Sequence, residues 1–519
     1  METWFIILAS LCIAFSLKSL LNLLRSSPSH QKIKNLPPGP TNVPIIGSFQ
    51  WLRRSLADIE KILRELRSEY GPLITLRIGP NPAIFVASHS LAHQALVQNG
   101  AVFSDRPKAT ATSRVVSSNQ CNISSAPYGP TWRLLRRNLT AEILHPSRIK
   151  SYSRARNWAL GILLEKLGKH GESGEGVKLI DHFQYTVFCL LVLMCFGDKL
   201  EEGKIKEIEK VQRKLLLGFR RFNVINFFPR IGRIIFPGRW KELMETRQEQ
   251  ERIFVPLIHA RARSKNGESR SEEEIVAYVD SLLRLELPEE KRKLTDGEIV
   301  GLISEFLSGG TDTTATALQW IMANLVNNPE IQEKLYGEIS TVLQNSPDRK
   351  IVREEDLAEM RYLKAVVLEG LRRHPPGHFV LPHTVTEEAE LNGYTIPKNA
   401  AINFMVADMG LDPKVWDDPL EFKPERFLTG NQNEGAGQEM FDITGSREIK
   451  MMPFGAGRRI CPGWGLAMLH LEYFLANLVW HFEWRSVEGE KVDLEEELEF
   501  TVVMKNPLRA KLRLRSSQS

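Results

Sequence analysis

Cys461 is the residue whose surroundings best suit a reactive sulfur. It lies in a glycine-rich segment, residues 453–463, directly before an apolar helix pattern that starts near Leu466. Because Pro462 suits the first position of a helix, we expect Cys461 to cap the N-terminus of that helix. Backbone N–H groups and the helix dipole there stabilise a thiolate, and a thiolate is a metal ligand. The alternative is an inert, buried cysteine.

A second candidate lies inside a long apolar run. Thr295 and Glu298 have the spacing of a capping box, which predicts that a long, mostly buried helix begins here and reaches Leu325. Its middle, residues 308–314, reads Ser-Gly-Gly-Thr-Asp-Thr-Thr, a cluster of poor helix formers. Such a local conflict often marks a functional site. A kink in which threonine hydroxyls bond to backbone carbonyls is a compatible alternative.

The segment around Cys461 also carries a family resemblance. Its residues match the signature Phe-x-x-Gly-x-Arg-x-Cys-x-Gly in register, at Phe454, Gly457, Arg459, Cys461 and Gly463. The chain therefore resembles the cytochrome P-450 family, and looks most like its plant microsomal branch. The resemblance implies haem b with Cys461 as the axial thiolate, glycines that let the backbone approach the macrocycle, and Phe454 shielding the sulfur. Thiolate ligation favours cleavage of the O–O bond.

The same resemblance implies a role for the cluster in the long helix. Residues 309–314 are similar to the family's oxygen-side element, Ala/Gly-Gly-x-Asp/Glu-Thr-Thr/Ser. A hydroxyl and a carboxylate beside bound dioxygen can relay protons to it. The resemblance thus implies that Thr313 contacts dioxygen and that Asp312 controls proton entry from solvent.

Four residues are implied to hold the haem propionates. Trp132 and Arg136 reproduce the family's Trp-x-x-x-Arg helix element, whose indole N–H and guanidinium meet a propionate. Arg459 and His383 are expected to join them. For His383, a satisfied polar residue without this role is an equal alternative.

A further set, Glu369, Arg372 and Arg426, is implied to be structural. Glu369 and Arg372 lie three residues apart, on one face of a predicted helix. Residues 422–427 resemble a second family element, whose arginine joins that pair in a buried ionic cluster. Such a cluster fixes geometry and tolerates the loss of one member badly.

Length and periodicity predict how these residues are positioned. A chain of 519 residues with 42% hydrophobic content suffices for one large globular body or two ordinary domains. Helical spacing dominates, in segments that include 132–144, 183–196, 205–222 and 240–262. Strand patterns occur near 74–78 and 83–87. We predict a mainly α fold with a small β region, the cytochrome P-450 fold, with the haem-thiolate catalytic domain over residues 46–519.

The N-terminal run predicts a membrane anchor. Residues 4–24 are mostly apolar and long enough to span a bilayer. A cleaved signal peptide is the competing interpretation, but Glu2 precedes the run and basic residues follow it, which favours a retained span with the main body in the cytosol. We expect a single-pass anchor over residues 1–25, a proline-rich hinge over 26–45, and the endoplasmic reticulum as the membrane.

The partners follow from composition and from the motifs. The net charge of +5 is small and no long basic run accompanies it, which argues against nucleic-acid binding. Because no Gly-x-Gly-x-x-Gly fingerprint follows a strand, we expect electrons from NADPH through a separate flavoprotein reductase. Basic residues expected on the thiolate side could steer it, although a solvated basic face is the simpler explanation. They are Arg133, Arg137, Arg447, Lys450 and Arg458.

We therefore predict a haem-dependent monooxygenase that inserts one oxygen atom from O2 into a lipophilic small molecule, a plant metabolite. A loose resemblance to a plant branch that oxidises open-chain chlorophyll breakdown products suggests a substrate. Two alternatives remain open: a reductase-independent haem-thiolate isomerase or dehydratase, and a non-catalytic haem-binding sensor. The pair Asp312 and Thr313 argues against the first.

Substrate contacts are expected in the apolar segments 101–125, 215–236 and 379–382, and near Gly309 and Val503. Several phenylalanines between Leu215 and Phe236 are expected either to meet the membrane surface or to pack in the core. They are Phe219, Phe222, Phe227 and Phe228.

Overall fold

The computed structural model describes residues 35–40, 56–78, 82–173, 176–227, 231–265, 275–344, 350–428 and 441–515. The predicted anchor over residues 1–25 and most of the predicted hinge lie outside these ranges. The helices within them are α3 (Leu56–Tyr70), α4 (His89–His93), α5 (Ala111–Val116), α6 (Pro130–Glu142), α7 (Pro146–Ser151), α8 (Ser153–Ser173), α9 (Leu179–Phe196), α10 (Glu202–Asn223), α11 (Gly232–Ile235), α12 (Pro237–Lys265), α13 (Tyr278–Leu282), α14 (Asp296–Asn327), α15 (Pro329–Leu343), α16 (Arg361–Arg373), α17 (Val406–Gly410) and α18 (Trp464–His481).

The strands are short and form small sheets. The largest sheet has the order β1-β2-β9-β6, in which β1 pairs antiparallel with β2, and β2 pairs parallel with β9. A second sheet has the order β10-β13-β3, and β11 forms a hairpin with β12. The bounds are β1 (Leu73–Arg77), β2 (Pro82–Val86), β3 (Val177–Lys178), β4 (Glu286–Leu287), β5 (Arg292–Lys293), β6 (His383–Thr384), β7 (Ala389–Leu391), β8 (Tyr394–Ile396), β9 (Ala401–Phe404), β10 (Phe482–Ser486), β11 (Glu496–Leu498), β12 (Val502–Met504) and β13 (Arg509–Leu514).

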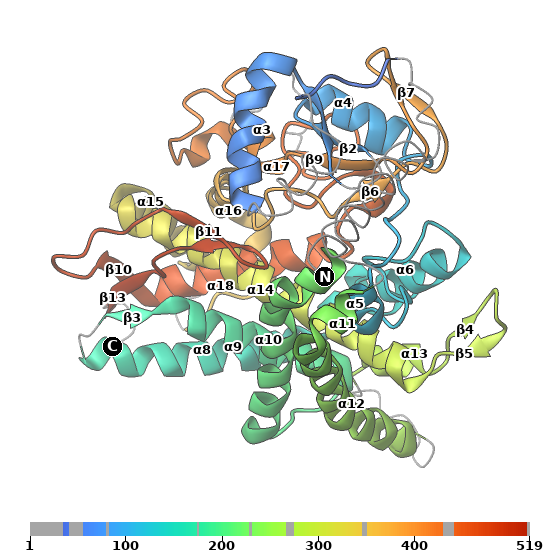
Figure 1. Ribbon diagram of the computed structural model, residues 1–519. Coiled ribbons are helices and arrows are strands. Elements are labelled where there is room, and N and C mark those ends of the chain that lie inside the picture. Colours follow the sequence, from blue (N-terminus) through green and yellow to red (C-terminus); the bar gives the residue numbers. More distant parts are fainter. Residues whose placement is uncertain are drawn as a thin grey trace, which may run out of the picture.

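The predicted fold class is confirmed. Figure 1 shows α3 and the largest sheet in the upper part of the molecule, and the long helices below them. The four predicted helical segments correspond to α6, α9, α10 and α12, and the two predicted strands to β1 and β2, with ends that differ by a few residues.

The long helix α14 forms as its capping box predicts. The Glu298 N–H donates to the Thr295 hydroxyl at 3.3 Å, and the Thr295 N–H donates to the Glu298 carboxylate at 2.8 Å. These bonds satisfy orphan donors of the first turn. The helix then continues through residues 308–314 without interruption to Asn327. Packing against α9, α12, α16 and α18 outweighs the poor helix propensity of that cluster.

Helix α9 is apolar enough to suggest a membrane span, but it belongs to the core. It is the one helix of the described residues that is long and apolar enough to cross a bilayer, and 78% of it is buried inside the protein. Its neighbours are α14 and α8. A helix that is hydrophobic all round is expected at the centre of a large domain.

Candidate active site

The loop that carries Cys461 reaches the start of α18 through one tight turn. The Cys461 N–H donates to the Phe454 carbonyl at 2.8 Å, which folds the loop back on itself. Sequence reasoning placed Cys461 at the helix cap with Pro462 as the first helical residue, and this was wrong. Gly463 is the N-cap, and α18 begins at Trp464. The turn formed by Pro462 and Gly463 separates the sulfur from the helix.

Opposing effects act on the pKa of the Cys461 thiol. Burial raises the pKa of the Cys461 thiol, while the Gly463 N–H and the positive charge of Arg136 lower it. Both of these groups stabilise the thiolate rather than the thiol. Coordination to a metal removes the thiol proton outright, so this site suits a sulfur that functions as a metal ligand.

Gly457 fits the loop because no side chain can stand there. Its φ is +68°, and a Cβ atom would lie 1.9 Å from the Leu96 carbonyl oxygen. Leu96 belongs to the π-helical segment η1 (Gln94–Gln98). The 3-10 turn η5 (Gly457–Arg459) therefore packs directly on η1, which fixes the position of the loop relative to that segment.

Arg459 and Trp132 lie together beside this loop. The Arg459 guanidinium lies 4.3 Å from the centre of the Trp132 ring, a cation–π contact. Arg459 donates to the carbonyls of Ser104 at 2.8 Å and Ala126 at 2.7 Å. The Trp132 indole N–H donates to the Ile123 carbonyl at 3.1 Å, so in this structure its partner is the backbone.

Arg106 is a member of this group that sequence reasoning missed. It is buried, and donates to the backbone carbonyls of Ser124 at 2.7 Å and Leu381 at 2.7 Å. Burial lowers its pKa to about 9, and the charge of Arg459 acts in the same direction. No periodic pattern surrounds Arg106 in the sequence, so nothing there distinguishes it from a surface arginine.

His383 lies in the same neighbourhood. Its Nδ1 is 2.6 Å from the Phe103 carbonyl oxygen, and the ring is buried. Burial lowers its pKa to about 3, and the charges of Arg106 and Arg459 add to this effect. His383 is therefore neutral at physiological pH. It contributes a polar ring, not a charge, to this cluster.

Arg136 completes a set of arginines that form no direct ion pair with a carboxylate in the part of the chain that the structure describes. Burial lowers the pKa of its guanidinium, which lies within electrostatic reach of Cys461. Among the residues that the structure describes, no carboxylate forms an ion pair with Arg106, Arg136 or Arg459. Buried or half-buried arginines of this kind suit a ligand that brings its own carboxylates. The donor set around Cys461 thus fits haem, which offers an iron for the thiolate and two propionates for the cations.

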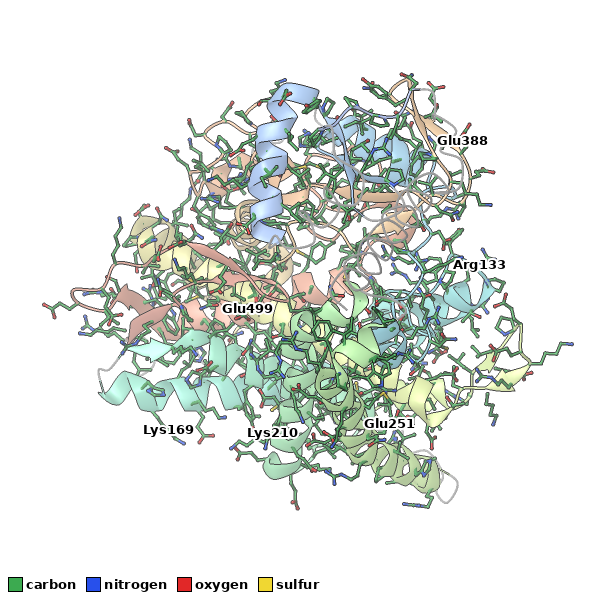
Figure 2. The ribbon with its side chains drawn as sticks, in the orientation of Figure 1. Arg133, Lys169, Lys210, Glu251, Glu388 and Glu499 are labelled. Atoms are coloured by element: carbon green, nitrogen blue, oxygen red, sulfur yellow. The ribbon has the colours of Figure 1, made fainter. Side chains whose placement is uncertain are left out.

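Asp312 and Thr313 face different surroundings on α14. Asp312 accepts hydrogen bonds from Gln184 at 3.1 Å and from Arg213 at 3.3 Å, on α9 and α10. Burial raises its pKa, Arg213 lowers it, and Glu499 in the turn after β11 raises it again. Figure 2 labels Glu499 near the centre of the molecule. Because the side chain of Arg213 is 37% exposed, Asp312 is connected to solvent on this side.

The Thr313 hydroxyl donates to the Gly309 carbonyl at 2.6 Å, one turn earlier. Gly309 is exposed although it lies in the middle of a largely buried helix. A Cβ atom built on it would meet no atom within 4 Å. The Gly309 and Thr313 face of α14 therefore borders open space, whereas Asp312 faces the neighbouring helices.

The predicted ionic cluster is present in the structure. Glu369 and Arg372 are both 0% exposed and form two hydrogen bonds of 2.7 Å. Arg426 donates to the same carboxylate at 3.1 Å. Arg372 also donates to the carbonyls of Gly410, Pro419 and Glu421, at 2.6, 2.9 and 3.2 Å, so its remaining protons are satisfied. These bonds tie α16 to the chain that leads into the Cys461 loop.

Comparison with known proteins decides the family. A family model for cytochrome P-450 matches residues 37–514. The chain belongs to the cytochrome P-450 family. It is 49% identical to cytochrome P-450 89A9 of Arabidopsis thaliana over 98% of both chains, and 31% identical to salviol synthase of Salvia pomifera over 94% and 93%. A zebra fish cytochrome P-450 structure with abiraterone superposes with a TM-score of 0.71 at 22% identity, covering 88% of this chain and 100% of that one.

Membership of the family makes this cytochrome P-450 a haem-thiolate monooxygenase. Its fold is that of the family, as the superposition shows. The predictions of the family, the fold, the haem cofactor and the enzyme class are confirmed. The assignments of individual residues to roles remain predictions, as do the limits of the anchor, the hinge and the catalytic domain.

The structure decides between the two environments that were expected for Phe222 in this cytochrome P-450. Phe222 was expected to meet either membrane or core, and the structure places it in the core, 2% exposed beside Leu215 and Leu243. The large apolar side chains that are exposed nearby are Leu217 on α10, at 48%, and three isoleucines in and directly before α11. Ile231, Ile234 and Ile235 are 49%, 77% and 46% exposed. Phe228 lies outside the described residues.

Proposed function

We propose that this cytochrome P-450 inserts one oxygen atom from O2 into a lipophilic plant metabolite, with electrons from NADPH delivered by a separate flavoprotein reductase. The observation that carries this proposal is that Asp312 and Thr313 lie in different surroundings on α14. Asp312 faces a solvent-connected side, and Thr313 faces open space beside Gly309. A proton source on one side of a helix and a hydroxyl on the other suit a reaction that consumes protons at a buried centre.

The proposed roles follow from these contacts. The haem, held by Cys461, supplies the binding and activation of dioxygen. Asp312 takes up protons from the Arg213 side, because it bonds to a side chain that reaches solvent and because burial raises its pKa, which favours the protonated form. The Thr313 hydroxyl is the group that presents a proton to the open side. Trp132, Arg136, Arg459 and His383 orient the propionates, together with Arg106.

A basic surface supports the proposed reductase partner. Arg458 donates to the Tyr128 hydroxyl at 2.6 Å, and Arg133 lies 5.6 Å from the centre of the same ring. Both arginines are exposed, and Figure 2 shows Arg133 on α6, at the edge of the molecule. Arg458 is three residues from Cys461, so positive charge lies close to the thiolate loop. Opposite charge on a partner increases the rate of encounter at such a surface.

We also propose that the enzyme is anchored in the endoplasmic reticulum membrane by residues 1–25, with the catalytic domain in the cytosol. The exposed isoleucines of α11, together with Arg233 and Arg239, give the domain a second contact with the membrane surface. This arrangement lets a lipophilic substrate enter from the bilayer.

An open-chain chlorophyll breakdown product is the substrate that we propose to try first. The family resemblance suggests this class. A pocket for a lipophilic substrate selects by shape, so a panel of smaller lipophilic metabolites should be compared in parallel.

The first test is a carbon monoxide difference spectrum of the reduced protein beside a Cys461→Ser variant. We expect a red-shifted thiolate band in the wild type and its loss in the variant.

The second test is turnover. NADPH, a plant flavoprotein reductase and the substrate panel are added, and incorporation of one atom from labelled O2 into product is measured by mass spectrometry. Turnover with a peroxide and no reductase would favour the isomerase or dehydratase, and ligand-dependent spectra without any product would favour a sensor.

A further inference from the structure

Glu305 forms a contact that the catalytic cycle does not require. It lies on α14, one turn before Gly309, with its carboxylate turned towards a loop between α5 and α6. The Ile123 N–H donates to one carboxylate oxygen at 2.9 Å, and the Ser124 N–H donates to the other at 2.6 Å. A single carboxylate therefore holds two consecutive peptide groups, and both of its oxygens are used.

The peptide group between Ile123 and Ser124 is also bonded at its carbonyl, and the next carbonyl along the chain accepts from a third side chain. The Ile123 carbonyl accepts from Trp132 at 3.1 Å and from Arg459 at 3.2 Å. The Ser124 carbonyl accepts from Arg106 at 2.7 Å. The peptide group between Ile123 and Ser124 thus lies between a carboxylate at its N–H and two donors at its C=O. Hydrogen bonds in such a series polarise and strengthen one another.

Two carboxylates place negative charge near the arginines of this cluster. Glu305 and Asp105 are the carboxylates that act on Arg459 and on Arg106 through space, and neither forms an ion pair with either arginine. The arginines keep their guanidinium protons directed at backbone oxygens. If the Glu305 charge were removed, the loop would lose one of its anchors and the arginines would lose a counter-charge.

We propose that Glu305 is a positioning residue for the haem: through the peptides of Ile123 and Ser124 it fixes Trp132, Arg459 and Arg106 in the orientation that receives the propionates. This inference rests on the proposed roles of those three residues. It couples the oxygen side of the enzyme to its haem anchor, because one helix carries both Glu305 and Asp312.

The test is a Glu305→Gln variant of the full chain, loaded with haem. An amide nitrogen cannot accept a hydrogen bond, so one of the two peptide contacts is lost. We expect haem transfer to apomyoglobin to be faster by about tenfold or more, in the range seen when groups that orient a metal site are removed. The carbon monoxide band should keep its thiolate position, because Glu305 does not touch the Cys461 loop.

A matched control separates positioning from stability. Glu298 lies on the same helix and forms two bonds of 2.8 Å with Arg292, whereas the Ile123 and Ser124 N–H groups are bonded to Glu305. Glu298→Gln should lower the unfolding temperature and leave haem transfer within about twofold of the wild type. Equal acceleration by Glu298→Gln, or no acceleration by Glu305→Gln, would overturn the proposal.

A double variant tests whether Glu305 acts on haem retention through Arg459. In an Arg459→Gln background, Glu305→Gln should add less acceleration than it does in the wild type, because one of the three side chains through which it acts is already gone. If Glu305→Gln does not fold, Glu305→Asp keeps the charge but shortens the reach, and should give an intermediate rate. Additive rates would count against the proposal. Absence of a thiolate band in the wild type would instead contradict the enzyme's proposed function, independently of Glu305.

Discussion

Asp312 and Thr313 are neighbours in sequence, but the helix directs their side chains to different surroundings. Replacing Asp312 with asparagine keeps the size of the side chain and removes its ability to carry a proton. We expect turnover at saturating substrate to fall by about 100-fold. NADPH-dependent product formation measures this, and the carbon monoxide band should stay unchanged.

Glu209 provides the control for that experiment. It lines the same small cavity as Asp312, next to Arg213, and burial also raises its pKa. Glu209→Gln therefore changes a nearby carboxyl on α10 and leaves Asp312 and Thr313 on α14 unchanged. A loss of turnover as large as that of Asp312→Asn would mean that the cavity, not Asp312, controls the protons.

At the level of residues, the sequence motifs located most of the candidate site. Cys461, Glu369 and Arg372 could be chosen because each belongs to a local pattern with fixed spacing. Arg106 could not, since its partners are backbone carbonyls from distant segments. Glu305 left a usable signal, a carboxylate within an apolar helical run, and such a group needs a partner when it is buried.

The helix α14 depends on its first turn as well as on packing. Thr295→Ala removes the hydroxyl that accepts the Glu298 N–H, which should lower the free energy of unfolding by about 1 kcal/mol. Thermal or denaturant unfolding measures the change. Thr341→Ala, on an exposed face of α15, is the control and should leave stability nearly unchanged. Equal losses in both variants would exclude a capping effect.

The α11 surface gives a prediction for membrane contact. In a protein that lacks residues 1–34, Ile234→Glu places a charge on the most exposed apolar side chain of that element. We expect binding to vesicles of phosphatidylcholine and phosphatidylserine to weaken by about tenfold, since a charge there opposes burial in the interface. Sedimentation with vesicles measures it. Leu420→Glu, 68% exposed away from α11, should bind as the wild type does, and a loss there would contradict the assignment.

Elements were predicted well where one physical signal dominated. The capping box predicted the start of α14, and 3.6-residue periodicity predicted α9, α10 and α12. The start of α18 was misplaced because Pro462 suits a turn as well as a first helical position. The sequence could not decide whether Phe222 lies in the core or at the membrane surface, since an aromatic residue on an amphipathic helix has the same pattern in both.

Across the whole molecule, buried histidines make stability depend on pH. Burial lowers the pKa of His470 to about 3. An unfolded chain takes up a proton at this residue near pH 6.5, whereas the folded chain does not, so stability falls as pH drops below 6.5. In His470→Gln this contribution disappears, and the fall should be shallower by about 1.4 kcal/mol for each pH unit. Denaturant unfolding at pH 7, 6 and 5 measures the slope, and parallel slopes would contradict the prediction.

The assembly of the site is the part that could not be predicted. Residues near 105, 123, 305 and 459 meet in one cluster, and no local pattern encodes that meeting. Helical periodicity reports which face of an element is buried, but not which element covers it. The family resemblance supplied this arrangement for the motif residues alone.

The contact between Gly457 and Leu96 also determines when the haem site can form. The thiolate loop closes directly on η1, and Arg459 binds carbonyls of Ser104 and Ala126, so the site joins the two ends of the chain. During synthesis the N-terminal half of the chain emerges first, and the segment that carries Cys461 is made much later. Stable haem binding therefore comes after nearly the whole chain has been made, and a truncated chain that ends before Cys461 lacks both the ligand and the loop that packs on η1.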